Sequence, residues 1–302
     1  MTYIIENAHV LKGQAISNTS LLVDGERIIS ARPSFNQYNY MRMDADAYIM
    51  TPTHALFDPN LPLTGPFKER KDYFLKNFLL RGSTIVLTTV KVQYERELDL
   101  RLKQAKSDLI DSPIDYVLGI SIPARLLNPV FVRKCKKAKI PAFFLEISDM
   151  KELDRIPWGW VKEAMFPFNS PIIPVFPDCK NKKEKQLQLN VWAERMKREG
   201  IPAVYEELAV LSPIRRTILK KIGIIPAKSN LHSGGELSYN LYQKNDETAM
   251  LDENGLFSSC SHLLAVTVDK GKVIRAGCEV YYRPGKGENV IINTPGFFTD
   301  NY

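Results

Sequence analysis

A group of polar residues directly follows an apolar stretch near residue 50. Residues 51–60 read TPTHALFDPN, in which Asp58 and Asn60 flank Pro59. In an extended chain, residues two apart point to the same side, so these two side chains could hold a metal ion or a polar ligand together. Asp, Pro and Asn are also frequent in turns, because Asp and Asn bond to the nearby backbone and Pro fixes its own φ angle. The segment could therefore form a metal site, a ligand site or a plain strand end.

Further carboxylates follow two other apolar runs. Glu146 ends the run AFFLE, and Glu206 with Glu207 follows IPAVY. Together, Asp58, Glu146 and Glu206 would make an all-oxygen site that suits magnesium, calcium or manganese better than zinc. The Glu206–Glu207 pair could instead provide an acid and a base, one with a raised pKa. The simpler alternative is that one of the two faces solvent while the other caps a helix or meets an arginine.

Other motifs that carry chemistry are weak. The four cysteines (Cys135, Cys179, Cys260 and Cys278) form no CxxC pair, so we expect reduced and mostly buried thiols. The segment LHSGGEL lacks the strand–elbow–helix context of a serine nucleophile and is typical of a turn. The segment RPGKGEN lacks the spacing of a phosphate-binding loop and is expected to be a hairpin loop.

Composition excludes some classes of protein. Of the 302 residues, 44% are apolar and 25% are charged, as in ordinary globular proteins. No apolar run approaches the roughly 18–20 residues that cross a bilayer, and the first ten residues lack the features of a signal peptide, so we expect a cytoplasmic protein. The net charge of +7 gathers in VRKCKKAKIP, CKNKKEKQLQ and RRTILKKIG. No aromatic residues interleave with these clusters, which argues against nucleic-acid binding.

The apolar pattern predicts three stretches of chain. Residues 1–50 have the pattern of short strands, with a hairpin signal at Asp24-Gly25. Residues 51–228 alternate short, continuous apolar runs with amphipathic stretches in about six units, as in a parallel sheet covered on both faces. Ser212-Pro213 predicts a helix start and Gly200 a helix end. Residues 229–302 return to a strand pattern.

These stretches predict an α/β fold of two domains. Neither β end has enough strands to form a core alone, so we expect residues 1–50 and 229–302 to make one small β domain. Eight strand–helix units would make a TIM barrel. About six units in residues 51–228 therefore predict a shortened or irregular TIM-like (β/α) barrel.

Several segments resemble the amidohydrolase superfamily, especially its dihydroorotase and N-acetylglucosamine-6-phosphate deacetylase branches. In order along the chain they are VDGERI (23–28), MDA (43–45), IMTP (49–52), LRGSTIVLTTV (80–90), GIIPAKSNLH (223–232) and VTVDKGKVIRAG (266–277). They frame the whole chain, with little similarity between about 92 and 210. The resemblance implies a metal-dependent hydrolase fold with its site at the ends of the barrel strands.

The metal ligands that this resemblance implies are largely missing. The family places a His-x-His pair after the first barrel strand, and here Asp58 and Asn60 stand at those two positions. His54 precedes the motif and would point differently. Glu146 suits the middle-strand ligand, but the last-strand ligand is matched only loosely, by Glu206 or Glu207. The chain is thus similar to a divergent family member that lacks the HxH metal motif.

Two functions follow from this pattern. The first, which we favour, is a non-catalytic protein without cofactor that binds a small-molecule ligand or a protein partner in a pocket formed by Asp58, Asn60, Glu146 and Glu206. The second is a hydrolase of amide or lactam C–N bonds, with one divalent metal on Asp58, Glu146 and Glu206 or with no metal. If Asp58 converges with the two glutamates, the second is supported; if Asp58 caps a turn, it is not. The composite β domain and open barrel edges are compatible with a homodimer.

Overall fold

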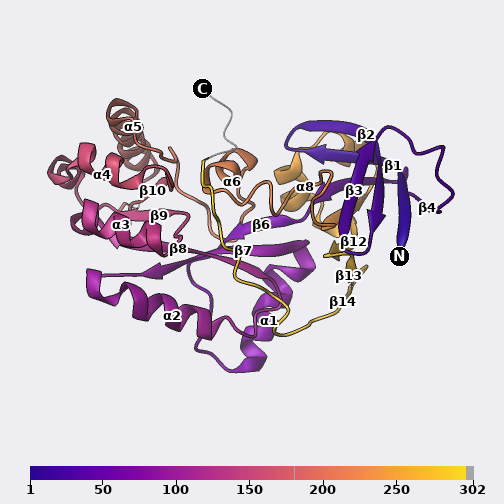
Figure 1. Cartoon of the computed structure of the whole chain (residues 1–302), viewed down its shortest axis with the longest axis horizontal. Coiled ribbons are helices and arrows are strands. Elements are labelled where there is room, and N and C mark those ends of the chain that lie inside the picture. Colours follow the sequence, from indigo (N-terminus) through magenta and orange to yellow (C-terminus); the bar gives the residue numbers. More distant parts are fainter. Residues whose placement is uncertain (180, 297–302) are drawn as a thin grey trace.

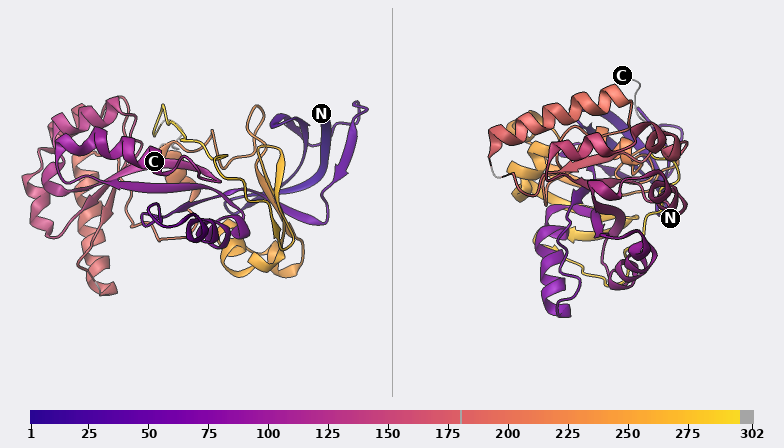
Figure 2. Two further views of the ribbon diagram at one scale, coloured as in Figure 1. Left: turned by 90° about the horizontal axis from the view of Figure 1, so that it is seen from below. Right: turned by 90° about the vertical axis from the view of Figure 1, so that its left-hand side faces the viewer.

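The computed structural model describes residues 1–179 and 181–296. It contains a curled, half-barrel parallel sheet surrounded by helices and a separate, larger β-sheet beside it (Figure 1). The two sheets lie next to each other along the long axis of an elongated molecule (Figure 2). Within the described residues, no helix is both long and apolar enough to cross a membrane.

The larger sheet has nine strands and combines both ends of the chain. Its strands are β1 (Thr2–Lys12), β2 (Ala15–Asp24), β3 (Arg27–Arg32), β4 (Met41–Asp44), β5 (Tyr48–Pro52), β11 (Tyr239–Gln243), β12 (Leu264–Asp269), β13 (Lys272–Ala276) and β14 (Glu279–Val280). Their order is β14-β13-β12-β11-β5-β1-β2-β3, with β4 paired to β1. β5 and β11 pair antiparallel and so join the N-terminal strands to the C-terminal ones, as the sequence predicted. The Asp24-Gly25 hairpin is also confirmed, with Gly25 at a φ of 57°.

The parallel sheet has five strands in sequential order. They are β6 (His54–Phe57), β7 (Ser83–Lys91), β8 (Asp115–Pro123), β9 (Phe143–Glu146) and β10 (Ile172–Val175). The helices that accompany them are α1 (Phe67–Asn77), α2 (Leu98–Asp108), α3 (Pro129–Lys137), α4 (Trp158–Met165), α5 (Lys182–Glu199) and α6 (Arg216–Ile222). Two short helices, α7 (Asp246–Ala249) and α8 (Glu253–Ser259), lie between β11 and β12.

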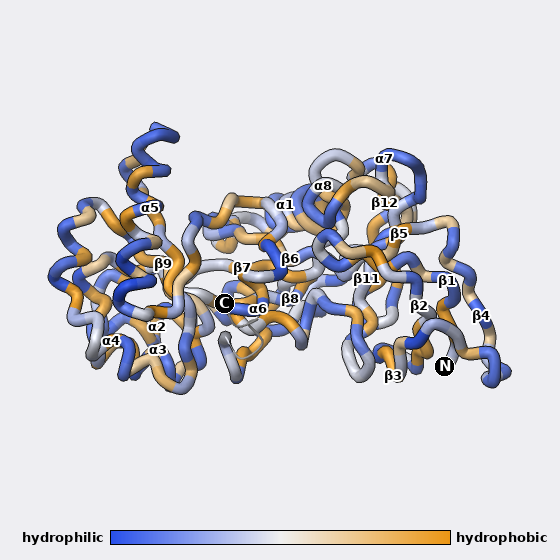
Figure 3. The backbone as a smooth tube through the Cα atoms, turned by 90° about the horizontal axis from the view of Figure 1, so that it is seen from above, coloured by the Kyte–Doolittle hydropathy of each residue, from blue (hydrophilic) through white to orange (hydrophobic). Residues whose placement is uncertain are grey.

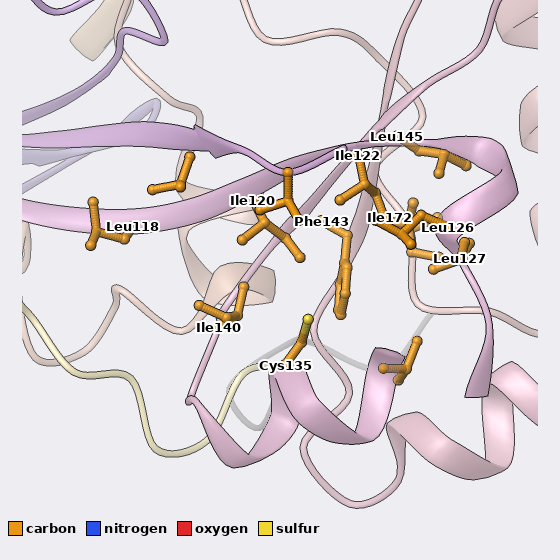
Figure 4. Close-up of a cluster of buried hydrophobic side chains, with 14 of the residues drawn as sticks. Leu118, Ile120, Ile122, Leu126, Leu127, Cys135, Ile140, Phe143, Leu145 and Ile172 are labelled. Carbon is orange, nitrogen blue, oxygen red and sulfur yellow. The ribbon is translucent and has the colours of Figure 1, made fainter. Parts of the chain in front are cut away.

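Both faces of the parallel sheet are buried, which explains its continuous apolar runs. On the outer face, Leu118 and Ile120 of β8 and Phe143 of β9 belong to one buried cluster with Cys135 of α3 (Figure 4). The inner face carries the alternate residues, such as Phe144, and is covered by α6. Cys135 is fully buried and free, and burial raises the pKa of its thiol.

The long helix α5 is only loosely attached to this core. Trp192 and Met196 are its buried residues, and both lie in its second half. Its first half is mainly hydrophilic and extends away from the body of the molecule (Figure 3). The helix ends at Gly200 in the left-handed conformation, as the sequence predicted.

The expected sixth barrel strand is reduced to a bridge. Val204 N donates to Ile172 O at 2.9 Å, so the chain pairs briefly with β10. Further on, Leu211 N donates to Phe57 O at 2.8 Å, which places the same segment against β6. One irregular stretch, residues 201–214, thus bonds to both edge strands of the sheet. The predicted helix start at Ser212-Pro213 is wrong, since Pro213 pairs with β6 and α6 begins only at Arg216.

The C-terminal segment leaves the nine-stranded sheet after β14. Tyr116 N donates to Glu288 O and Val290 N donates to Tyr116 O, both at 2.9 Å, so residues 287–290 run along the start of β8. We call residues 287–290 the strap. RPGKGEN (283–289) leads into this strap across the half-barrel and does not form the expected hairpin loop. A Cβ at Gly287 would lie 1.9 Å from Ile114 O, so this close approach requires glycine. The domain boundaries at residues 50 and 228 stay predictions.

Candidate functional site

A cavity of 390 Å³ opens at the C-terminal ends of the parallel strands. Its polar lining consists of Asn60, Thr89, Lys91, Ser121, Glu146 and Glu207. Its apolar lining includes Phe57, Phe144, Val175, Phe176, Leu208 and Val210. The lining comes from the ends of β6 to β10 and from the irregular stretch that follows Ala203. Parallel α/β sheets and barrels bind their ligands at this end of the strands.

An aromatic pair forms the apolar side of the cavity. The rings of Phe57 and Phe144 are stacked, with their centroids 4.9 Å apart and an interplanar angle of 7°. Gly119 on β8 leaves room for Phe144, because a Cβ at Gly119 would lie 2.8 Å from that ring. The absence of a side chain on β8 thus fixes where the ring of β9 can lie.

Glu146 is the central polar group of the cavity. Ser121 Oγ donates to Glu146 Oε1 at 2.8 Å. Lys91 Nζ lies 3.2 Å from the same oxygen. The three side chains stand at the ends of the neighbouring strands β7, β8 and β9, which are in parallel register. The strand ends therefore bring a cation, a hydroxyl and a carboxylate into contact.

Asp58 belongs to a turn and does not line the cavity. Its side chain is fully buried. Asn60 N donates to Asp58 Oδ1 at 2.9 Å, and Tyr73 of α1 donates its hydroxyl to Asp58 Oδ2 at 2.6 Å. Burial, together with the hydrogen bond to Asp58, raises the pKa of Tyr73 and keeps its proton in place. Both carboxylate oxygens are thus used inside the structure.

The two adjacent glutamates in the irregular stretch have different environments. Glu206 pairs with Arg215 at the start of α6 and is not among the cavity residues. Glu207 lines the cavity, where it accepts the backbone N–H of Phe176 and pairs with Lys185 of α5. Both glutamates are therefore neutralised by a basic side chain.

The histidines also lie away from the cavity. His54 is buried at the start of β6, where its Nε2 lies 2.9 Å from the Tyr242 hydroxyl and its ring contacts Phe257. Burial and the nearby Arg81 guanidinium lower the pKa of His54 to about 4, so the imidazole is neutral at physiological pH. His9 pairs with Asp46 on the nine-stranded sheet.

The residues present do not fit the binuclear metal centre that the resemblance implies. Of the candidates from the sequence, Asn60 and Glu146 line the cavity, whereas Asp58 and Glu206 do not. Across the described part of the chain, no group of three His, Cys, Asp or Glu side chains is arranged to hold a metal ion. The carboxylate of Asp58 is also committed to Tyr73 and to the backbone of its own turn.

Three cavity residues were missed in the sequence: Thr89, Lys91 and Ser121. They lie in the last residues of the strands STIVLTTVK and DYVLGISIP. That position is itself a signal, because side chains at strand ends form the site in such folds. Glu207 could not be separated from Glu206, because the stretch after Ala203 is irregular and has no strand alternation.

The comparisons with known proteins identify the fold. No family model and no curated protein matches the sequence. Among solved structures, a D-hydantoinase from Bacillus sp. AR9 matches with a TM-score of 0.64 and 9% identity, covering 97% of this chain and 99% of that one. The dihydropyrimidinase from Brevibacillus agri matches with a TM-score of 0.60 and 10% identity over the same shares. The chain has a hydantoinase-like fold.

Other matches agree with this result. The L-hydantoinase of Arthrobacter aurescens has a TM-score of 0.56 at 10% identity, covering 96% of this chain and 100% of that one. A prolidase matches with a TM-score of 0.54 at 8% identity. The resemblance inferred from the sequence is therefore confirmed at the level of the fold. At such low identity, the likeness carries no information on activity.

Proposed function

We propose that this chain is a small-molecule-binding protein that keeps a shortened, TIM-like amidohydrolase scaffold without the binuclear metal centre. The observation that carries the proposal is the separation of Asp58 from Glu146. Asp58 is held by Tyr73 and by its own turn, while Glu146 remains in an open cavity with Lys91 and Ser121. The scaffold thus offers a binding pocket but no converging set of carboxylates.

The alternative, a hydrolase of C–N bonds, requires an activated water molecule. Such activation needs a metal that lowers the pKa of water to about 7, or a general base of suitable pKa near the substrate. The described cavity residues include no histidine, and Glu207 is already neutralised by Lys185. Glu146 is the remaining carboxylate there, and it is paired with Lys91. These features favour binding over hydrolysis, although the structural neighbours hydrolyse C–N amide bonds.

One experiment separates the two functions. Purified protein is screened by ligand-observed NMR against a fragment library, and its turnover of hydantoin and dihydrouracil is measured with added Zn²⁺, Mn²⁺ or Mg²⁺. We expect cavity ligands whose binding is lost in Val210→Trp, because the substitution places a bulky ring on the cavity lining, and no metal-dependent turnover. Turnover that is lost in both Asp58→Asn and Glu146→Gln would overturn the proposal in favour of the hydrolase.

A further inference from the structure

The cavity contains a positively charged donor and a negatively charged acceptor that can each form a further hydrogen bond. Lys91 is the accessible cation, because 65% of its side chain is exposed and the described residues give it one partner, Glu146. An ammonium group has three donor hydrogens, so Lys91 can bind a further acceptor. Its long, exposed side chain can also turn toward a ligand without disturbing the sheet.

Glu146 is the complementary acceptor. Ser121 and Lys91 both contact its Oε1 atom, and no hydrogen bond or ion pair within the described residues uses Oε2. Only 21% of the Glu146 side chain is exposed, so a cation bound there would be largely shielded from water. Charged hydrogen bonds are strongest in such a shielded place.

Of the other polar residues that line the cavity, some already form hydrogen bonds within the protein and others do not. The side chains of Asn60 and Thr89 make no hydrogen bond within the described residues, so both can serve a ligand. Glu207, by contrast, uses one oxygen for Phe176 N and the other for Lys185. The groups left for recognition are therefore one cation, one carboxylate, one amide and one hydroxyl.

This set discriminates between charge types. A ligand with only a negative charge would compete with Glu146 for Lys91, and leaving the shielded Glu146 carboxylate without its counter-ion is costly. A ligand with only a positive charge would pair with Glu146 but would make no use of the spare donor hydrogens of Lys91. A ligand that carries both charges replaces the Lys91–Glu146 pair with two new pairs, so neither side chain is left unpaired.

We propose, building on the proposed function, that the cavity binds a zwitterion with an apolar side chain, such as a free hydrophobic α-amino acid. Its carboxylate pairs with Lys91 and accepts from Asn60, and its ammonium group pairs with Glu146. Its side chain lies against the apolar wall that includes Phe176 and Val210. A cavity of 390 Å³ lies at the small end of the range for ligand pockets and suits a molecule of this size.

The test uses four matched ligands in calorimetric titration at one pH. Leucine carries both charges, N-acetyl-leucine only the negative one, leucinamide only the positive one, and N-acetyl-leucinamide neither. We expect leucine to bind and each singly charged analogue to bind roughly ten- to a hundred-fold more weakly, because each loses one charged hydrogen-bonded pair. Phenylalanine, valine and methionine with their matched analogues repeat the test for other side chains.

Variants of the cavity residues test which side chain binds the ammonium group of the ligand and which binds its carboxylate. In Glu146→Gln, we expect leucine and leucinamide to lose roughly ten-fold or more in affinity while N-acetyl-leucine does not weaken. In Lys91→Met, we expect the loss to fall on leucine and N-acetyl-leucine and to spare leucinamide. Lys134→Met is the matched control, because Lys134 also pairs with a glutamate, Glu95, but lies on α3 outside the cavity. This control variant should bind all four ligands as the wild type does.

The other outcomes contradict the zwitterion proposal, the proposed function or both. If N-acetyl-leucine or leucinamide binds as tightly as leucine, the zwitterion proposal is wrong. If no amino acid binds but the fragment screen finds ligands that Val210→Trp excludes, the zwitterion proposal is wrong and the proposed function stands. If every ligand found still binds to Val210→Trp, the cavity is not the binding site and the proposed function is wrong as well.

Discussion

The two ends of the parallel sheet use charged residues in opposite ways. At the start of β8, Asp115 is only 4% exposed and pairs with Lys228 at 2.7 Å and with Lys270 at 2.9 Å. At the other end of the sheet, Lys91 is 65% exposed and its described partner is Glu146. The first end joins the half-barrel to the nine-stranded sheet, while the second opens into the cavity.

The two ends differ in how many hydrogen bonds their charged groups can still form. Asp115 also accepts the backbone N–H of Glu288, so its oxygens hold a strap, a sheet turn and the segment after α6 together. Burial lowers the pKa of Lys228, but Asp115 and Glu236 outweigh this effect and raise the pKa above its ordinary value. Saturated charges of this kind have a structural role, whereas charges with spare capacity in a cavity are available for a ligand.

The largest effect is expected where the saturated cluster is broken. Asp115→Ala would leave two largely buried lysines without their shared anion. Removing one partner of a buried ion pair costs about 3–5 kcal/mol of unfolding free energy. Urea denaturation followed by far-UV circular dichroism measures this loss.

Asp154→Ala is the control for the Asp115 variant. Asp154 also pairs with an arginine, Arg195, but 61% of its side chain is exposed. An exposed pair contributes about 0–1 kcal/mol. Equal losses in the two variants would contradict the structural role of the Asp115 cluster.

A pH-dependent effect on stability is expected from His54. It lies at the start of β6, the same end of the parallel sheet as Asp115. The pKa of His54 is about 4 in the folded protein and near 6.5 when unfolded. Between these values the unfolded chain binds a proton that the folded protein does not, so stability falls as the pH drops from 6.5 to 4. The loss attributable to His54 approaches about 3 kcal/mol near pH 4.

His54→Gln isolates this contribution, because glutamine stays neutral and can still bond to Tyr242. The unfolding free energies of wild type and variant are compared at pH 7.5, 6 and 4.5. We expect the wild type to lose more stability than the variant over this range. Parallel curves would show that His54 does not have the lowered pKa.

Much of the fold followed from the sequence, and the reasons are physical. The continuous apolar runs identified the buried strands, and too few strands at either end indicated a shared sheet, which the β5–β11 pair confirms. The strap at 287–290 was not predictable, since Gly287 is defined by its approach to Ile114 on another segment. The sixth strand was overestimated because IPAVY has a strand pattern but pairs with β10 only at Ala203.

The site was less predictable than the fold. Position along the chain placed Asn60 and Glu146 at strand ends, and both line the cavity. The same reasoning could not predict that Tyr73, fifteen residues later on α1, donates a hydrogen bond to the carboxylate of Asp58. Partners of a side chain depend on how helices pack on the sheet, and a local pattern does not contain that information.

A smaller effect is expected from the turn that holds Asp58. Tyr73→Phe removes the donor to Asp58 Oδ2 and leaves a buried carboxylate oxygen without that partner. The expected loss is about 1–3 kcal/mol of unfolding free energy, with no change in the affinity of cavity ligands. Thermal and urea denaturation measure the first quantity and calorimetric titration the second. A stable variant with altered ligand affinity would place Asp58 in the binding site instead.

The smallest effect on stability is expected at the cavity, and this result would complete the comparison. Glu146→Gln breaks the ion pair with the exposed Lys91, and the glutamine can still accept from Ser121. Because Lys91 is the exposed partner of this pair and stays solvated when the pair is broken, the unfolding free energy should change by less than about 1 kcal/mol in urea denaturation. A loss as large as that of Asp115→Ala would mean that Glu146 holds the strand ends together, as Asp115 holds their beginnings. A near-neutral result would mean that the fold does not need this carboxylate, which is the property expected of a group whose role is to bind a ligand.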